Sequence, residues 1–566
     1  MRRRLDRRAL LATAAGVLFA GCTPGQYAEQ ADRDAYRAVG QTQRFALGSA
    51  RDFAVRYDPF AAGDANAAPI RVGPKVIPVG EGKPVTLALD ECLEIAIRNS
   101  RQFQTRKETL YSTALALANS RRGWDFPLLG GAIDGSASRS VVNRGGETNA
   151  GTFTPEATLT QQFVHGGALT LGLGVDLVSD LLGWRSTTVG SLLSANFTQP
   201  LLRGAGRGLA YEDQYRAERD FVFSVLEYER FTQEFAVDTL TRYYGVLQQR
   251  DQLENERANI KRLEETFALT KALVQGGIRS PTEQDEAEQN LINAKVRFEQ
   301  DQQQYRNALD RFKLTLGLPI AAQAKLNYPA ALTKLNDAGP KPITVKEAEA
   351  LSVAMVTRPD VLQQAAAVRD AERDVVIAAD RFLPQLDVTL GAAAASTAPR
   401  KFTRVQFHRH RREAAATFNY ELDQTGHRDA YRNAMLARDK ARRDWEEFVD
   451  QVRLEIRQSY RSLVQSQTSY ELEVRNVEIA KRRRKLIVLE QKEGQASARD
   501  VLTAEDALRR AQNSLTNALV SYTTTRLQFM TTLGLVRVDE KGRIHERAKP
   551  FRFDRIRERY PYVAGQ

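Results

Sequence analysis

The sequence contains two copies of one pattern, and this duplication limits the fold more than any other feature. Residues 274–291 align without a gap with residues 491–508, and the same offset pairs the Leu-Gly-Leu sequence at 316–318 with that at 533–535. Each copy has the pattern of a helix, then strands, then two long helices. Because repeated units bury their apolar faces against one another, the duplication predicts two related modules packed together.

The long helices of both copies show a seven-residue rhythm of mostly apolar residues. In the first copy these positions are Val225, Thr232, Thr239, Val246, Leu253, Ile260, Phe267 and Val274. In the second copy they are Val449, Ile456, Leu463, Tyr470 and Val477. This rhythm predicts coiled-coil packing. A helix over about 210–275 would be ~100 Å long at 1.5 Å per residue, far longer than a compact domain needs.

The turn between the long helices carries helix-capping residues in both copies. A glycine supplies the left-handed position that ends the first helix, and a serine followed three residues later by an acidic residue forms a capping box at the start of the second. The matching residues are Gly277 and Gly494, Ser280 and Ser497, and Glu283 and Asp500. Both long pairs are therefore predicted to be helical hairpins with tight tips.

Alternating segments lie between the helices of each copy. They are ATLTQQF, ALTLGLGVD and SLLSANFTQP in the first copy, and LDVTLGAAAA and EAAATFNYE in the second. Strands of about ten residues with one apolar face suit a transmembrane barrel. No run of the sequence reaches the ~18 apolar residues of a spanning helix, so a membrane crossing would need strands. The first copy is longer here, and we expect its surplus to form an extra hairpin or a long external loop.

The N-terminal residues have the pattern of an export signal. Five arginines precede an apolar run, and the sequence LFAGC at 18–22 resembles a bacterial lipobox, whose cysteine is lipidated with chains such as palmitate. We expect residues 1–21 to be a lipoprotein signal peptide and Cys22 to be the lipid anchor. The alternative is an ordinary signal peptide with a bystander cysteine. The Pro-rich and Ala-rich segment 22–84 predicts an extended leader.

Composition argues against metal and enzyme chemistry. Two Cys, four Met and five His supply few ligands for a metal site, so we expect no metal and no cofactor. We find no phosphate-binding loop, metal box or catalytic triad pattern, and an enzyme is not expected. The net charge of +12 is concentrated toward the C-terminal tail, 537–566. A solvated tail, or one facing an anionic surface, explains this charge better than nucleic-acid binding does.

The duplicated Gly-x-x-Ser-x-x-acid tips, the run DVLTAEDAL and the Leu-Gly-Leu ending of each copy resemble the TolC family of outer membrane efflux proteins. The two family-type repeats would be 85–320 and 341–536. The resemblance implies an α+β membrane protein that forms a homotrimer. Each chain would give four strands to a twelve-stranded transmembrane β-barrel, continued by a long α-helical coiled-coil tunnel in the periplasm.

The resemblance also implies location and partners. The chain would be a lipid-anchored channel in the outer membrane of a two-membrane bacterium, passing substrates from the periplasm to the exterior. A periplasmic adaptor, or membrane fusion, protein and an inner membrane transporter would complete an efflux pump or a type I secretion system. The cargo stays open among drugs, metals, polysaccharide and protein. A periplasmic coiled-coil lipoprotein with a structural or adaptor role is the alternative, although it would not need alternating strands.

The resemblance assigns candidate residues at the hairpin tips. In the family, an acidic residue just past the second tip helps form the periplasmic constriction, and Asp500 matches that position, with Glu283 as its counterpart in the first copy. Thr503 stands where the family has a second aspartate. Three carboxylates around a narrow axis would attract cations, whereas helix capping is the alternative role for both residues. The tip residues that match the family's adaptor contacts are Gly277, Ser280, Gly494 and Ser497.

A basic run at 481–485 precedes the second tip, and Glu264 and Glu265 occupy the equivalent part of the first copy. One hypothesis is that these charges attract each other and help keep the entrance closed. The alternative is a solvated face, because an exposed ion pair contributes only ~0–1 kcal/mol.

Overall fold

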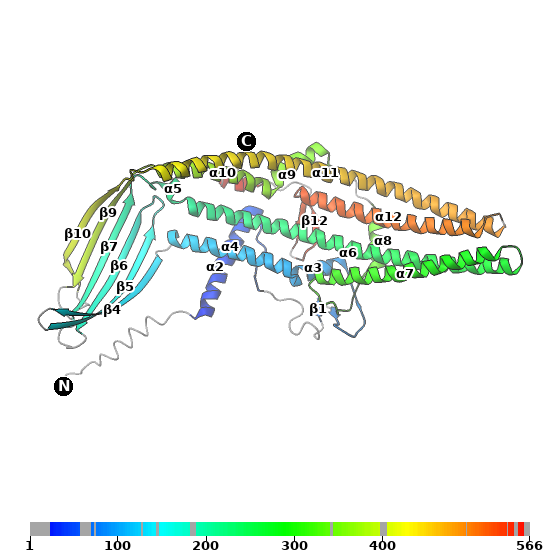
Figure 1. Cartoon of the computed structure of the whole chain (residues 1–566), viewed down its shortest axis with the longest axis horizontal. Coiled ribbons are helices and arrows are strands. Elements are labelled where there is room, and N and C mark those ends of the chain that lie inside the picture. The colour runs from blue at the N-terminus through cyan, green and yellow to red at the C-terminus, as the bar shows by residue number, and fades with distance from the viewer. Residues whose placement is uncertain are drawn as a thin grey trace, which may run out of the picture.

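The computed structural model describes residues 23–56, 70–72, 75–125, 128–142, 146–180, 188–339, 343, 345–396, 405–493, 495–539, 541–547 and 553–559. Figure 1 shows an elongated molecule with a six-stranded sheet at one end and two long helical hairpins reaching away from it. Shorter helices and small sheets pack around the middle of the long helices. The sheet and the hairpin tips therefore lie at opposite ends of the molecule.

The two repeats have the same order of elements. The first consists of α3 (Leu89–Asn99), α4 (Arg101–Asp125), β4 (Leu128–Val142), β5 (Gly146–Gln162), β6 (Ala168–Asp180), β7 (Thr188–Pro200), the short α5 (Arg207–Ala210), α6 (Glu212–Gln275) and α7 (Pro281–Thr315). The second consists of α9 (Glu347–Thr357), α10 (Pro359–Asp380), β9 (Gln385–Ser396), β10 (Val405–Asn419), α11 (Thr425–Lys492) and α12 (Ala498–Thr532). The expected duplication is therefore confirmed.

The six strands form one antiparallel sheet in the order β10-β9-β7-β6-β5-β4. The four strands per chain that the resemblance implies are therefore too few. In the first repeat β4 follows a helix as β9 does, and β7 precedes a long helix as β10 does, so the inserted pair is β5 and β6. The surplus residues of the first copy thus form the extra hairpin, one of the two outcomes expected for them.

The sheet has one mainly apolar and one mainly polar face. Cross-strand register places Leu169 and Leu171 of β6 on the same face as Phe197 of β7 and Leu390 of β9, and Leu390 is 52% exposed. On the other face, register aligns residues such as Thr170, Gly172, Ser194, Asn196, Thr198 and Thr389. The Thr198 and Thr389 hydroxyls lie 3.2 Å apart. Such a sheet suits a wall between lipid and water.

The long helices bury the predicted seven-residue seam. α6 has 64 residues and α11 has 68, which correspond to about 95–100 Å at 1.5 Å per residue. Thr239, Ile456 and Leu463 of this seam are at most 2% exposed. α6 packs on α7 and α11 on α12, and α12 also packs against α6, which joins the repeats. Among the described residues, no helix combines the length and apolar character needed to span a membrane.

The Leu-Gly-Leu sequences end each repeat for a packing reason. Gly317 has φ 71° and Gly534 has φ 67°, in the left-handed region that favours glycine. A Cβ on Gly317 would lie 2.3 Å from the carbonyl oxygen of Asn99, where α3 ends. A Cβ on Gly534 would lie 3.3 Å from Thr357, where α9 ends. In both repeats the glycine lets the end of the hairpin approach the break between the two preceding helices.

The leader expected at 22–84 is not simply extended. α2 (Pro24–Leu47) packs against α4 and α6, and its Ala35 and Val39 are fully buried. Strands β1 (Ile70–Val72) and β2 (Lys75–Ile77) pair with each other. β3 (Val85–Leu87) pairs in parallel with β8 (Ala324–Leu326), which is followed by α8 (Tyr328–Ala338). The prediction of an extended leader is wrong for α2, because the spacing of its apolar residues lets one face of a helix bury against α4 and α6. Residues 1–22, including Cys22, lie outside the described residues.

The C-terminal segment is also more ordered than the expectation of a solvated tail. β11 (Val536–Val538) and β12 (Ile544–Glu546) form an antiparallel pair that contacts α6. α13 (Asp554–Arg559) follows, and its Ile556 is 1% exposed within an apolar cluster that includes Leu226 and Leu362. The described part of this basic segment therefore packs on the helices of both repeats.

Candidate functional site at the hairpin tips

The first hairpin tip joins α6 to α7 through a glycine turn. Gly277 has φ 73°, and its N–H donates to the carbonyl oxygen of Val274 at 3.0 Å. Ser280 begins α7, with Pro281 at the first helical position, and its Oγ accepts a hydrogen bond from the Thr282 backbone N at 3.2 Å. The predicted capping roles of Gly277 and Ser280 are confirmed, whereas their contact with an adaptor stays a prediction.

The second tip contains a complete capping box between Ser497 and Asp500. The Asp500 backbone N donates to Ser497 Oγ at 3.3 Å, and Asp500 Oδ2 accepts from Ser497 Oγ at 2.6 Å and from the Ser497 backbone N at 3.1 Å. These hydrogen bonds from Ser497 lower the pKa of the Asp500 carboxyl below its ordinary value. The capping role of Asp500 is therefore confirmed, and its gate role stays a prediction. Gly494 lies outside the described residues.

The two tips contact each other within one chain. Arg279 Nη2, on the first tip, donates to the carbonyl oxygen of Ala496 on the second at 2.8 Å. The backbone N of Ala498 donates to Glu283 Oε2 at 3.5 Å, and Glu283 Oε1 lies 3.6 Å from Arg279 Nη1. The predicted capping box would turn Glu283 toward Ser280, and that expectation is wrong. The Glu283 carboxylate instead bridges the tips because Arg279 and Ala498 N–H offer it a charge and a donor.

One buried carboxylate joins three helices above the tips. Glu505 of α12 is 1% exposed. Its Oε2 lies 2.5 Å from Arg262 Nε of α6, and its Oε1 lies 2.6 Å from Arg484 Nε of α11. A buried charge requires such partners because burial removes its hydration. Glu505 therefore ties the first hairpin to the second.

A second buried carboxylate joins the same two helices with the charges exchanged, because the acidic residue is now on α6 and an arginine is on α12. Glu256 of α6 is 1% exposed and lies 3.3 Å from Arg297 Nε of α7 and 3.3 Å from Arg509 Nε of α12. Sequence reasoning missed both carboxylates. A signal for Glu256 was available, because it lies three residues after the seam residue Leu253 and four before Ile260, where a heptad expects an apolar side chain.

The hypothesis that the basic run attracts Glu264 and Glu265 does not describe the contacts found. Glu264 Oε1 lies 3.3 Å from Lys295 Nζ on α7, and both side chains are more than half exposed. Arg484, inside the basic run, is instead paired with the buried Glu505. Charge does join the hairpins here, but it does so through α12, which packs against both α6 and α11.

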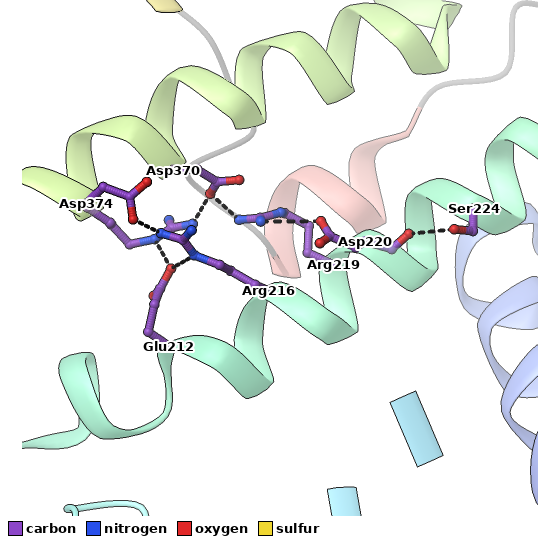
Figure 2. A network of polar contacts seen from close by, with 8 residues as sticks. Glu212, Arg216, Arg219, Asp220, Ser224, Asp370 and Asp374 are labelled. Carbon is purple, nitrogen blue, oxygen red and sulfur yellow. Dashed lines mark hydrogen bonds and ion pairs between the residues drawn. The ribbon is translucent and has the colours of Figure 1, made fainter. Parts of the chain in front are cut away.

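A separate polar network joins the repeats at the sheet end of the long helices. Figure 2 shows Arg216 and Arg219 of α6 extending toward Asp370 and Asp374 of α10. Arg219 Nη1 lies 2.5 Å from Asp370 Oδ1, and Arg216 Nη2 lies 2.5 Å from Asp374 Oδ1. Arg216 Nε also donates to Glu212 Oε1 at 2.9 Å. Ion pairs between repeats are therefore present at both ends of α6.

Comparison with known families identifies the class of protein that this architecture belongs to. The model of the outer membrane efflux protein family matches residues 191–318 and 350–535, more than half of the chain. The chain therefore belongs to the outer membrane efflux protein family, and it is an outer membrane channel component rather than an enzyme. No curated protein sequence matches the chain.

Solved structures of outer membrane proteins share the fold. The CmeC outer membrane channel of Campylobacter jejuni is 16% identical, with a TM-score of 0.58 over 84% of this chain and 89% of that chain. The open state of the MtrE outer membrane channel of Neisseria gonorrhoeae is 14% identical, with a TM-score of 0.57 over 85% and 98%. VceC of Vibrio cholerae is 14% identical, with a TM-score of 0.55 over 79% and 96%. The family match, which makes the chain an outer membrane channel component, excludes the alternative of a periplasmic coiled-coil protein.

Proposed function

We propose that three copies of this chain enclose a water-filled duct that exports molecules from the periplasm through the outer membrane. The observation that carries the proposal is a sheet with one apolar and one polar face at the end of helices about 100 Å long. The apolar face would meet lipid, and the polar face would line the duct. The helices would form the periplasmic tunnel.

Self-association follows from the edges of the sheet. Strands cannot cross lipid with unpaired backbone groups, and the sheet of one chain ends at β4 and β10. Neighbouring copies would therefore have to pair these edges. The number of copies, three, comes from the resemblance to the TolC family.

The hairpin tips would form the closable periplasmic entrance. Asp500 is exposed at the second tip, and Glu283 links the two tips, so both acidic candidates lie in this region. We add Glu505 and its two arginine partners, because their contacts must break before α6 and α12 can separate. A periplasmic adaptor protein and an inner membrane transporter would engage and open these tips.

The direct test is electrical recording of the full-length protein purified in detergent. We expect a homotrimer by native mass spectrometry and discrete conductance steps in planar lipid bilayers, which heat denaturation abolishes. Monomers that give no conductance steps would overturn the proposal.

Lipid attachment at Cys22 is proposed separately, and a palmitate analogue tests it. In growing cells we expect the wild-type chain to incorporate the analogue and Cys22→Ser to lose it. Equal labelling of the two chains would exclude Cys22 as the acylated residue.

A further inference from the structure

The extra strands of the first repeat are part of a continuous sheet. β4 pairs with β5 from Leu128↔Thr160 to Val142↔Gly146, and β5 pairs with β6 from Gln162↔Ala168 to Ala150↔Asp180. The ladder between β6 and β7 continues this sheet toward the second repeat. Within the described sheet, β6 therefore has partners on both sides, and the edges are β4 and β10.

The two edge strands match in direction and length. Six antiparallel strands alternate in direction, so β4 runs opposite to β10, and each strand has 15 residues. Two neighbouring copies placed around an axis would therefore present β4 and β10 in the antiparallel orientation that a closed barrel needs.

The helix-proximal ends of the strands also lie near one level. Residue pairs at this end connect each strand to the next across the whole sheet. From β10 to β4 they are Asn419 with Gln385, Asp387 with Pro200, Thr198 with Ala168, Ala168 with Gln162, and Thr160 with Leu128. The end of β4 that follows α4 and the end of β10 that precedes α11 therefore belong to the same rim. In a symmetric ring, this rim brings Leu128 of one copy close in height to Asn419 of the next.

We propose that each copy contributes all six strands, so that three copies close an eighteen-stranded wall in which β4 of one copy pairs with β10 of the next. This proposal rests on the proposed trimer. Because barrel diameter grows roughly linearly with strand number, the sheet section would be about 1.5 times as wide as a twelve-stranded one. Walls of 16–18 strands leave an aqueous channel, so the narrow point of the duct would lie at the helical tips.

The competing arrangement is a twelve-stranded wall that excludes β4 and β5. In that arrangement β6 becomes the edge, and β10 of the next copy pairs with β6. The two arrangements place different residues beside β10, so disulfide formation between copies separates them.

Paired cysteines in a Cys92→Ala background provide the test. Register places Ala132 of β4 and Ala415 and Thr417 of β10 on the polar face of the sheet. One variant carries Ala132→Cys with Ala415→Cys, and another carries Ala132→Cys with Thr417→Cys. The two β10 positions differ by two residues, so they test two strand registers on the same face of the sheet. We expect mild oxidation to link neighbouring copies of at least one of these variants by a disulfide. The matched control is Thr170→Cys on β6 combined with Thr417→Cys, which should stay unlinked. The single-cysteine parents measure any contribution from Cys22.

The outcomes separate this inference from the proposed function. A conducting trimer that links through Ala132 supports the eighteen-stranded wall, and one that links through Thr170, or through neither pair, overturns it. Protein that forms no trimer and no pore overturns the proposed function instead.

Exclusion of polyethylene glycols from the outer mouth gives a measurement on the wild-type chain, with an expected cutoff radius about 1.5 times that of a twelve-stranded channel. An equal cutoff would contradict the proposal.

Discussion

The two repeats share one architecture but stabilise it differently. Both end in a left-handed glycine next to a helix break, and both begin the return helix of the hairpin at a serine cap. They differ in the details of these contacts, in the strands inserted into the first repeat, and in the two buried carboxylates, Glu256 and Glu505. The shared features satisfy backbone geometry. The two buried carboxylates lie where one repeat contacts the other, whereas the inserted strands pair within the first repeat.

The largest expected effect distinguishes the two buried carboxylates. Glu505→Ala leaves Arg262 and Arg484 without the carboxylate that lies 2.5 and 2.6 Å away, and we expect a cost of about 3–5 kcal/mol. Glu256→Ala removes contacts of 3.3 Å and should cost less. Hydrogen exchange along α12 measures both local opening free energies. Equal protection from hydrogen exchange in the two variants would mean that the two carboxylates stabilise the hairpins to the same extent.

The second-largest expected effect is the loss of stability when the glycines that end the two repeats are replaced by alanine. Gly317→Ala places a Cβ 2.3 Å from a backbone oxygen in a left-handed conformation, and we expect a destabilisation of about 3 kcal/mol. Gly534→Ala meets Thr357 at 3.3 Å and should cost about 1–2 kcal/mol. Chemical unfolding of the two variants in detergent provides the comparison. A larger loss for Gly534→Ala would reverse our ranking of the two helix breaks.

The serine caps give a smaller contrast. Ser497→Ala removes the two hydrogen bonds that Ser497 Oγ makes with Asp500, whereas Ser280→Ala removes one bond to Thr282. Loss of such caps costs about 0.5–2 kcal/mol, and we expect Ser497→Ala at the upper end of that range. Thermal unfolding midpoints measure the difference, with Ser224→Ala within α6 as the control outside the caps. Equal unfolding midpoints for the two cap variants would mean that the capping box at Ser497 stabilises its helix no more than the single bond at Ser280 does.

The pH dependence of the second tip should be the smallest effect. Ser497 lowers the pKa of Asp500, so the folded state favours the ionised carboxylate. This stabilisation is fully present above the ordinary pKa of about 3.9 and is lost as the pH falls through the lowered value. The difference in unfolding midpoint between wild type and Asp500→Asn should be constant from about pH 5 to 8 and shrink below about pH 4. A difference that changes near pH 7 would contradict this explanation.

Local rules predicted most of the helical architecture. The spacing of Ile456 and Leu463 predicted a seam that is buried, and the sequences around Ser280 and Ser497 predicted helix starts that are capped. Each of these features depends on residues close in sequence. The place of the surplus residues, among the strands of the first copy, also followed from the two offsets, but their form as a hairpin did not.

Features set by distant contacts were missed. The residues next to Glu505 in the sequence give no sign that it is buried. Its partners Arg262 and Arg484 are distant in the sequence and meet it only in the folded chain. The local capping box expected at Glu283 is absent, because the Glu283 carboxylate contacts Arg279 and the Ala498 backbone N of the second tip instead. The strand number implied by the family resemblance is too low for this chain, because the surplus residues, expected as a hairpin or a loop, form two further strands.

The most direct test of the account is single-channel recording of wild type, Glu505→Gln and Glu264→Gln under one set of conditions. Glu505→Gln removes the charge that joins α6, α11 and α12, whereas Glu264→Gln removes an exposed pair with Lys295. A duct closed at the tips predicts that Glu505→Gln raises conductance several-fold and that Glu264→Gln matches wild type. Absence of conductance from all three proteins, or identical conductance for wild type and Glu505→Gln, would contradict the account.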